Sequence, residues 1–473
     1  MRIPFAAQAY QARSIPLSSQ RLVNLYAEQA PEGAPSPLVV YGTPGLSLFA
    51  DLGTGPVRGL RVAAGALCVV AGETLYAVSS GGTATALGTI PGTGIVRMTD
   101  NGTQLVVVTP ETGAGYVYDT DGPTFAQITD PDWPGAGSCD FIDQYGIFTV
   151  PNTGRFFISA LADLTSYDAL DIATAESAPD NLVRVFVDHR EVWLFGTDST
   201  EVWYNSGAAA FPFERVSGGI LERGCTAAGS VAKCDNTVFW LGNDRVIYRA
   251  AGYQPQRIST HAIEYALAQV ADLTDAEAFT YTQEGHGFYV LTIPQANAGA
   301  GMTLCYDVAT GLWHERVSGA SAALRGRWRA QGQAYAYGRN IVGDCQSGKL
   351  YALDLDTHTE DGATIRRLAT SPPVAADGRR MLHLRLEVQV ESGAGLQSGQ
   401  GEDPQAMLRW SDDGGRTWGN EHWASMGAQG QYDRRVQWRR MGASRNRVYE
   451  LSISDPVKVA IIGATLDTQP LGA

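Results

Sequence analysis

Short β-type runs bounded by glycine or aspartate turns recur from about residue 55 to residue 355. Clear examples are GETLYAVSSGG (72–82), GAGYVYDTDG (113–122), STEVWYNSG (199–207), NDRVIYRAAG (243–252) and SGKLYALDLDT (347–357). Runs of this kind, rich in β-branched and aromatic residues between turn formers, predict short strands. The pattern therefore predicts an all-β chain.

One aromatic residue recurs in these runs at a nearly constant spacing, with gaps of 39 to 47 residues. The positions are Tyr76, Tyr118, Phe157, Tyr204, Tyr248, Tyr289 and Tyr335. A period of about 40–45 residues is typical of one four-stranded propeller blade, which must stack on its neighbours to cover its apolar faces. We expect a propeller-like repeat of four-stranded units. A set of smaller β-sandwiches or barrels is the alternative.

Two stretches rich in Ala, Leu and acidic residues interrupt the strands and predict short helical excursions, Ser159–Pro179 and His261–Phe279. In the second, apolar residues fall on one helix face, and Ser259 or Thr260 could cap its start. Those apolar residues are Ile263, Leu267, Val270 and Leu273.

The C-terminal part predicts a separate β unit. Met381–Val390 alternates apolar and polar residues, which is typical of a strand with one buried face. A Gly/Ser/Gln loop follows at 392–402, and Val457–Leu466 predicts a last strand. We divide the chain into an N-terminal arm (1–50), a β-propeller-like domain (51–360) and a C-terminal β-sandwich-like domain (361–473).

The net charge of −14 is unevenly distributed. The stretch 97–180 has 2 basic and 13 acidic residues, whereas 361–473 has 14 basic and 13 acidic residues. An acidic surface repels phosphates, so binding of nucleic acid in a basic groove is not expected. Arginines outnumber lysines by 32 to 3, and eight of the arginines form four sequential pairs. These pairs are either solvated strand ends or an arginine-rich contact surface. The pairs are Arg366-Arg367, Arg379-Arg380, Arg434-Arg435 and Arg439-Arg440.

The six cysteines have no CxxC spacing, and most lie in apolar runs. Buried free thiols, and folding in a reducing cytoplasm, are the expectation. No signal-peptide core is evident at the start, and no stretch approaches the roughly 20 apolar residues that cross a bilayer. We expect no membrane insertion.

The sharpest local motif is SDDGGRTW (411–418), which resembles the Asp-box, SxDxGxTW. In this motif Asp and Ser side chains bond turn amides, Gly permits the required dihedrals and Trp packs beneath the turn. We assign the motif a structural role, with these residues: Ser411, Asp413, Gly415, Thr417 and Trp418.

Catalytic, metal and cofactor signatures are weak throughout the sequence. The histidines form no HxxxH or HExxH, no cysteine pair has zinc spacing, and no GxSxG elbow occurs. Asp119-Thr120-Asp121-Gly122 lacks the downstream ligands of a calcium loop and predicts an Asx turn. We predict no enzyme activity, no catalytic residue, no metal site and no cofactor.

The central region STEVWYNSG…STHAIEYAL (199–267) closely resembles the packaged-DNA stabilisation, or tail hub (nozzle), proteins of Salmonella-type short-tailed bacteriophages (podoviruses). Four further stretches support the resemblance in the same order along the chain, and the C-terminal 100 residues match less clearly. These stretches are RLVNLYAEQAPEG (21–33), YGTPGL (41–46), SYDALDIATAESAPDNLV (166–183) and TLCYDVATGLWHER (303–316).

The resemblance implies a virion tail protein that forms a hexameric ring below the portal and its adaptor ring. Such proteins hold packaged DNA, conduct it during ejection and present surfaces to tailspike, fibre or needle proteins. Viral double-stranded DNA would pass through the lumen without sequence-specific binding, and acidic side chains from 97–180 would repel it there. The alternatives are a carbohydrate-binding or glycan-degrading propeller, suggested by the Asp-box and the abundant aromatics, and another virion β scaffold such as a spike base.

Overall fold

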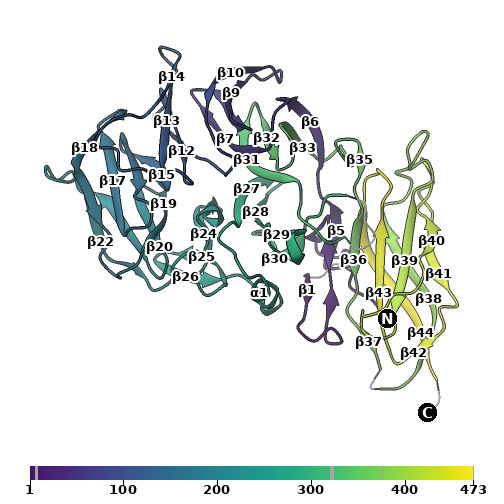
Figure 1. Cartoon of the computed structure of the whole chain (residues 1–473). Coiled ribbons are helices and arrows are strands. Elements are labelled where there is room, and N and C mark those ends of the chain that lie inside the picture. Colours follow the sequence, from purple (N-terminus) through teal and green to yellow (C-terminus); the bar gives the residue numbers. More distant parts are fainter. Residues whose placement is uncertain (6–8, 320–323, 377, 472–473) are drawn as a thin grey trace.

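The computed structural model describes residues 1–5, 9–319, 324–376 and 378–471, and its dominant feature is a ring of β-sheets (Figure 1). Within these residues, seven consecutive sheets each contribute one inner strand to the ring, and extensive contacts join the inner strands in six of the seven neighbouring pairs. This arrangement is a β-propeller, as the 40–45-residue period predicts.

The first five blades are simple four-stranded meanders. Blade 1 is β7 (Val57–Ala63), β8 (Ala66–Ala71), β9 (Thr74–Val78) and β10 (Ala84–Thr89), and blade 2 is β11 (Arg97–Asp100), β12 (Gln104–Thr109), β13 (Ala114–Asp119) and β14 (Thr124–Gln127). Blade 3 is β15 (Ser138–Ile142), β16 (Tyr145–Thr149), β17 (Arg155–Ala160) and β18 (Asp163–Thr174), and blade 4 is β19 (Leu182–Asp188), β20 (Glu191–Gly196), β21 (Thr200–Asn205) and β22 (Phe213–Leu221). Blade 5 is β23 (Ala232–Cys234), β24 (Thr237–Leu241), β25 (Ile247–Ala251) and β26 (Gln254–Arg257).

The last two blades incorporate strands from the start of the chain. Blade 6 is β27 (Glu277–Gln283), β28 (His286–Ile293), β29 (Met302–Asp307) and β30 (Leu312–Glu315). Blade 7 is β31 (Ala330–Ala336), β32 (Arg339–Asp344) and β33 (Lys349–Asp354), completed by the N-terminal strand β6 (Gly45–Asp51). Two short strands, β34 (Thr359–Glu360) and β35 (Ala363–Thr364), extend its outer edge. The N-terminal strand therefore closes the ring next to its last blade.

Seven apolar clusters hold the blades together, one between each pair of neighbours. On β12, Leu105 and Val107 pack toward blade 1, whereas Val106 and Val108 pack toward blade 3. Both faces of a blade's central strands are thus buried. The sequences of these strands are therefore continuous apolar runs and do not alternate between apolar and polar residues.

The aromatic repeat identifies five blades correctly. Tyr76, Tyr118, Phe157, Tyr204 and Tyr248 all lie on the third strand of their blades. Tyr289 and Tyr335 instead lie on a second and a first strand, and the third-strand aromatics of blades 6 and 7 are Tyr306 and Tyr351. The assignment of these two positions was wrong because a helix and a loop are inserted between blades 5 and 6.

Of the two predicted helices, the first is absent and the second is present over only the first part of His261–Phe279, since it ends at Ala268 and leaves Val270 and Leu273 outside the helix. Helix α1 (His261–Ala268) begins after Thr260, whose side chain accepts a hydrogen bond from the amide of Ile263. The prediction for Ser159–Pro179 was wrong, since most of this stretch forms the outer strand β18, paired with β17. Tyr167 packs there on Trp133, and such tertiary pairing outweighs the helix propensity of an Ala- and Leu-rich sequence. Two 3₁₀ turns, Ala228–Ser230 and Asn297–Gly299, complete the helical residues.

The C-terminal part forms a β-sandwich beside the propeller, with one shared core (Figure 1). One sheet contains β4 (Leu25–Gln29), β5 (Leu38–Gly42), β44 (Ala460–Pro470), β38 (Met381–Val390), β41 (Val436–Arg439) and β42 (Ala443–Ser444). The other contains β3 (Leu22–Val23), β36 (Arg367–Thr370), β37 (Val374–Ala375), β43 (Asn446–Ile453), β39 (Gln405–Ser411) and β40 (His422–Ser425). A small hairpin, β1 (Tyr10–Gln11) and β2 (Ser19–Gln20), lies between the propeller and the sandwich.

The two parts are joined by continuous hydrogen bonding. Strand β3 pairs with β30 of blade 6 on one side and with β36 of the sandwich on the other. Next to it, the fully buried Asn24 donates from Nδ2 to the carbonyl oxygens of Val317 (2.9 Å) and Arg366 (2.8 Å) and accepts from the amide of Val317 at 3.0 Å. One amide side chain therefore links the N-terminal strand, the propeller and the sandwich.

A buried histidine lies in the sandwich. His383 is fully buried, with Nδ1 2.7 Å from the Tyr449 hydroxyl and Nε2 2.9 Å from Ser444 Oγ. Burial, together with the nearby charge of Arg447, lowers the pKa of His383 to about 4. The native sandwich thus holds this imidazole in its neutral form near pH 7.

Candidate functional site

An ion pair spans the centre of the propeller. Arg97 begins the inner strand of blade 2 and Glu277 begins that of blade 6, 180 residues later. The guanidinium donates to both carboxylate oxygens, at 2.9 and 2.6 Å, and the two side chains are only 14% and 20% exposed. Burial alone would lower the pKa of Arg97, but the charge and hydrogen bonds of Glu277 raise it. The Arg97 guanidinium therefore stays charged.

Further charged groups surround this pair. Burial, and then the repulsion of Arg97, lower the pKa of Arg184 on β19 to about 10. Burial raises the pKa of Asp140 on β15, although its carboxylate accepts from the Val187 amide at 2.7 Å. Arg61 on β7 pairs with Asp100 at 2.5 Å. Acids and bases on the inner strands thus balance one another.

These contacts close the propeller axis. Side chains from opposite blades lie 2.6 Å apart at the axis. A B-DNA duplex is far wider than this gap, since its major groove alone is about 12 Å wide. A DNA duplex therefore has no path through the centre of one propeller. Sequence reasoning missed this pair because its members are far apart in the chain; aligning the blades would have shown a charged residue on most inner strands.

The acidic stretch 97–180 divides into structural and exposed carboxylates. Asp163 and Asp180 accept hydrogen bonds from turn amides, a common use of Asp side chains. Others are exposed, mainly on the loops and outer strands of blades 2 and 3, and give this part of the surface its charge: Glu111, Asp121, Asp132, Asp168 and Glu176.

The Asp-box residues form a turn between β39 and β40. Asp413 accepts hydrogen bonds from the hydroxyls of Ser411 (2.6 Å) and Thr417 (2.6 Å) and from the amide of Thr417, which lower its pKa. The amide of Gly415, at φ +103°, donates to Ser411 Oγ at 2.8 Å. Trp418 is half-buried, with Arg409 5.1 Å from its ring centre. Ser411, Asp413, Gly415 and Thr417 are thus linked by hydrogen bonds within the turn.

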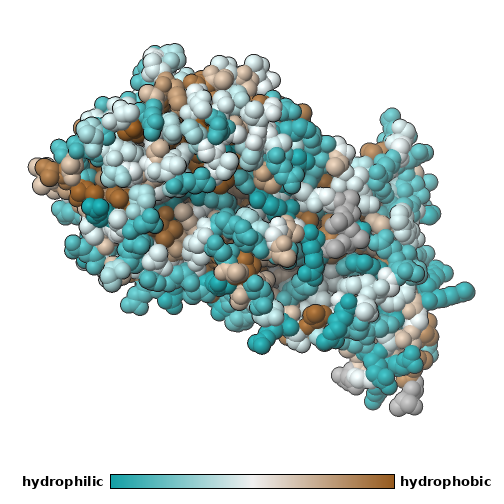
Figure 2. All heavy atoms as spheres, viewed as in Figure 1, coloured by the Kyte–Doolittle hydropathy of each residue, from teal (hydrophilic) through white to brown (hydrophobic). Residues whose placement is uncertain are grey.

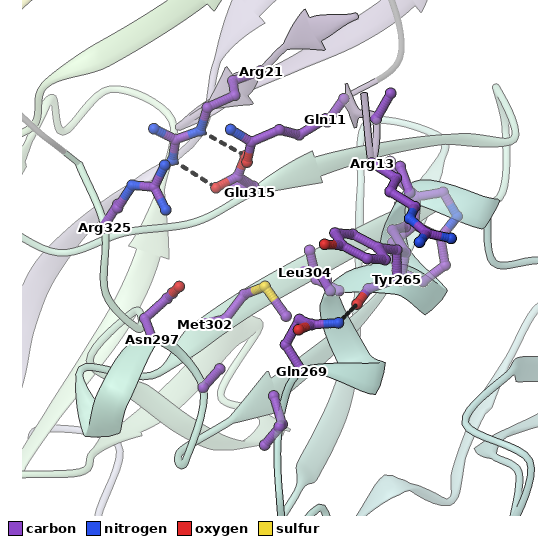
Figure 3. Close-up of a pocket in the computed structure, with 18 of the residues that line it drawn as sticks. Gln11, Arg13, Arg21, Tyr265, Gln269, Asn297, Met302, Leu304, Glu315 and Arg325 are labelled. Carbon is purple, nitrogen blue, oxygen red and sulfur yellow. Dashed lines mark hydrogen bonds and ion pairs between the residues drawn. The ribbon is translucent and has the colours of Figure 1, made fainter. Parts of the chain in front are cut away.

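A recess of about 740 Å³ lies beside helix α1 (Figure 3). Its floor is apolar, with Met302 and Leu304 from blade 6. On its rim, Glu315 is held by Arg21 through hydrogen bonds of 3.0 and 2.7 Å. The recess is suited to binding an apolar segment and lacks a nucleophile–base pair among its described lining residues.

The arginine pairs of the C-terminal part differ in location. Arg366 and Arg367 are buried, and Arg366 forms an ion pair with Glu421. The other three pairs are exposed and make no ion pair within the described residues. A contact surface in this part can therefore use three of the four pairs.

The six cysteines are free, and five of them are buried. Among the described residues, no group of three or more His, Cys, Asp or Glu side chains is arranged to hold a metal ion. None of the helices within those same ranges has the length and apolar character of a membrane span.

The fold defines the chain as a β-propeller protein with a C-terminal β-sandwich. More specifically, the chain belongs to the family of bacteriophage P22 Gp10. The family's β-propeller description matches residues 1–358, and its β-sandwich description matches residues 366–469. The protein is therefore a structural bacteriophage protein, consistent with a place in the virion.

Several solved structures are similar to this chain in fold. The computationally designed protein Ika8 has 13% identity and a TM-score of 0.39, with 71% of this chain and 99% of that chain covered. The β-propeller domain of Myceliophteria thermophila Cps50 (Swd1) has 8% identity and a TM-score of 0.41, with 65% of this chain and 98% of that chain covered. YCF48 bound to D1 peptide has 13% identity and a TM-score of 0.40, with 66% of this chain and 99% of that chain covered. No curated protein matches the chain in sequence.

Proposed function

We propose that this protein is the tail hub, or nozzle, subunit of a short-tailed phage. In this proposal six copies form a ring below the portal and its adaptor ring, close the DNA exit channel after packaging and conduct the genome during ejection. Tailspike, fibre or needle proteins dock on its outer surface. The subunit is made in the host cytoplasm and ends in the virion tail.

The sealed propeller axis carries this proposal. Because Arg97 and Glu277 meet across the axis, any passage for DNA has to be enclosed by several copies. The continuous hydrogen bonding from blade 6 through β3 to the sandwich supports a rigid wall element. The exposed carboxylates of blades 2 and 3 would repel phosphates if they face the passage, so that DNA slides without being held.

Electron microscopy of the intact particle tests the proposal. We expect six copies of the chain around the tail axis, with carboxylates predominating on the inner wall. Particles lacking the protein should package DNA and then lose it. A chain located away from the axis, a different stoichiometry or a predominantly basic lumen would contradict the proposal.

An activity assay addresses the glycan-directed alternative. The purified protein should release no sugar from host surface polysaccharide. Release that disappears on substitution of a single carboxylate would favour a glycan-degrading propeller.

A further inference from the structure

A shallow recess lies at the end of the propeller that is distant from the sandwich. It has a volume of about 500 Å³ and lies between blades 3 and 4. Its apolar lining includes Tyr145, Leu161, Ala208–Ala210 and Pro212. Leu161 is 59% exposed, and the alanines are also exposed. Figure 2 shows apolar atoms gathered at this end of the molecule, where β18 lies in Figure 1.

Acidic groups border the recess. Asp143 and Asp171 line it, and Asp168 lies three residues before Asp171 on the same outer strand. Asp143 is paired with Arg190, whereas Asp168 and Asp171 form no ion pair within the described chain. Burial and the charge of Asp168 raise the pKa of Asp171, which indicates a carboxylate without a compensating cation. The exposed lining of the recess is therefore mainly polar, with a few apolar side chains among the polar groups, and its charge is negative.

A loop at the opposite end of the molecule has the complementary character. Residues 431–435 precede strand β41 and expose Tyr432, 77% accessible, beside Arg434 and Arg435. Neither arginine forms an ion pair or a side-chain hydrogen bond in the described part of the chain. The loop is nevertheless anchored, because Ser392 Oγ donates to the Tyr432 carbonyl oxygen at 2.8 Å and the Tyr432 ring covers Gly393.

We propose that the loop Gln431–Arg435 of one copy docks into the recess between blades 3 and 4 of the next copy. Tyr432 would enter the recess, and Arg434 and Arg435 would reach Asp168 and Asp171. This inference rests on the proposed ring and identifies the surfaces that build it.

The positions of the two surfaces fit a ring. β18 and β22 lie at one end of the molecule and β41 at the other (Figure 1). A contact between two different surfaces of identical chains is head-to-tail, and it closes into a ring when the rotation between copies permits. Tyr and Arg are also the residues that most often dominate the binding energy of interfaces. One anchored aromatic and two unpaired cations thus meet the requirements of an interface centre.

Crosslinking in assembled tails tests the contact directly. The variant Tyr432→Cys/Ala209→Cys, treated with a short bismaleimide, should give a ladder of covalent multimers that ends at the closed ring. Each single variant should give none, and neither should Arg379→Cys/Ala209→Cys, whose first cysteine replaces an exposed arginine outside the loop. Absence of the ladder in tails that contain a ring overturns the inference and leaves the proposed function intact.

Charge reversal provides the second measurement. Arg434→Glu/Arg435→Glu and Asp168→Lys/Asp171→Lys should each lower incorporation into tails about tenfold, because like charges then face each other. The full-chain variant carrying all four changes should recover most of the incorporation. The matched control Arg379→Glu/Arg380→Glu should assemble normally.

The other outcomes of these experiments also test the proposed contact between the loop and the recess. Normal incorporation of both reversed variants, or no recovery in the combined variant, overturns the inference. Rings that persist but lose a spike or the adaptor would assign the loop to that partner instead. Wild-type tails without any ring of this chain would overturn the proposed function itself.

Discussion

Replacement of Glu277 by glutamine tests how much the fold depends on the ion pair at the propeller axis. The wild-type pair makes charge-assisted hydrogen bonds of 2.9 and 2.6 Å between side chains that are 14% and 20% exposed. In Glu277→Gln, the buried guanidinium of Arg97 loses its counter-charge while Arg184 stays nearby. Removal of one partner from a buried pair costs about 3–5 kcal/mol. We expect about 3 kcal/mol, since some solvent reaches both groups.

Chemical unfolding followed by tryptophan fluorescence measures this cost. The double variant Arg97→Met/Glu277→Leu removes both charges and should lie within about 1 kcal/mol of wild type, because neither charge is then left unpaired. The exposed pair Arg385–Asp467, with side chains 36% and 50% accessible, is the matched control. Asp467→Asn should cost no more than about 1 kcal/mol.

Two results would refute the reasoning. One is a loss below about 1 kcal/mol in Glu277→Gln, equal to that of the surface control. The other is a loss in Arg97→Met/Glu277→Leu equal to the sum of the losses in Arg97→Met and in Glu277→Leu, since residues in contact should show coupling of about 0.5–3 kcal/mol. Either result would mean that the closed axis does not contribute to stability through this pair.

Three further predictions concern the sandwich and its junction with the propeller. Asn24→Ala should lower the free energy of unfolding by about 3 kcal/mol, because three buried hydrogen bonds are lost and their partners stay desolvated; equal thermal midpoints for variant and wild type would contradict this. The pKa of His383 is about 4 in the folded state and about 6.5 in the unfolded state. The neutral imidazole therefore contributes its full stability above pH 6.5, and this contribution declines as the pH falls toward 4, by up to about 1.4 kcal/mol per pH unit. Unfolding midpoints between pH 7 and pH 4.5 should therefore fall less steeply in His383→Gln, and parallel profiles would refute the assignment. Asp413→Ala should cost about 1–2 kcal/mol by removing the acceptor of the Asp-box turn, with incorporation into tails unchanged at moderate temperature; a loss of incorporation without any loss of stability would instead indicate a binding role.

Local patterns predicted the elements whose environment is periodic. The alternation over Met381–Val390 predicted strand β38, and the apolar face with its Thr260 cap predicted α1. Strand β18 was not predictable in the same way, because its outward residues, such as Leu170, are exposed and its pairing with β17 is irregular. Its composition favoured a helix, and only the neighbouring strand decides the outcome.

Local sequence patterns could not predict contacts between residues that are distant in the chain. Strand β6 pairs with β33 about 300 residues later, and nothing in its own seven residues specifies that partner. The pair Arg97–Glu277 likewise joins residues 180 positions apart. Each of these contacts becomes predictable only when the blades are aligned on one another, since a closed ring brings its first and last strands together.

The way in which the blades are packed restricts how this protein can assemble. Apolar clusters occupy both faces of the blades, and ion pairs occupy the axis, so neither the blade faces nor the centre remains for a partner. Contacts with other copies, with tail proteins or with DNA therefore have to use outer strands, loops and the sandwich. On that remaining surface, the acidic recess between blades 3 and 4 and the arginine-flanked Tyr432 loop are complementary in charge and lie at opposite ends of the molecule. In the proposed ring, each subunit joins its neighbours at its ends, and the enclosed passage lies between subunits.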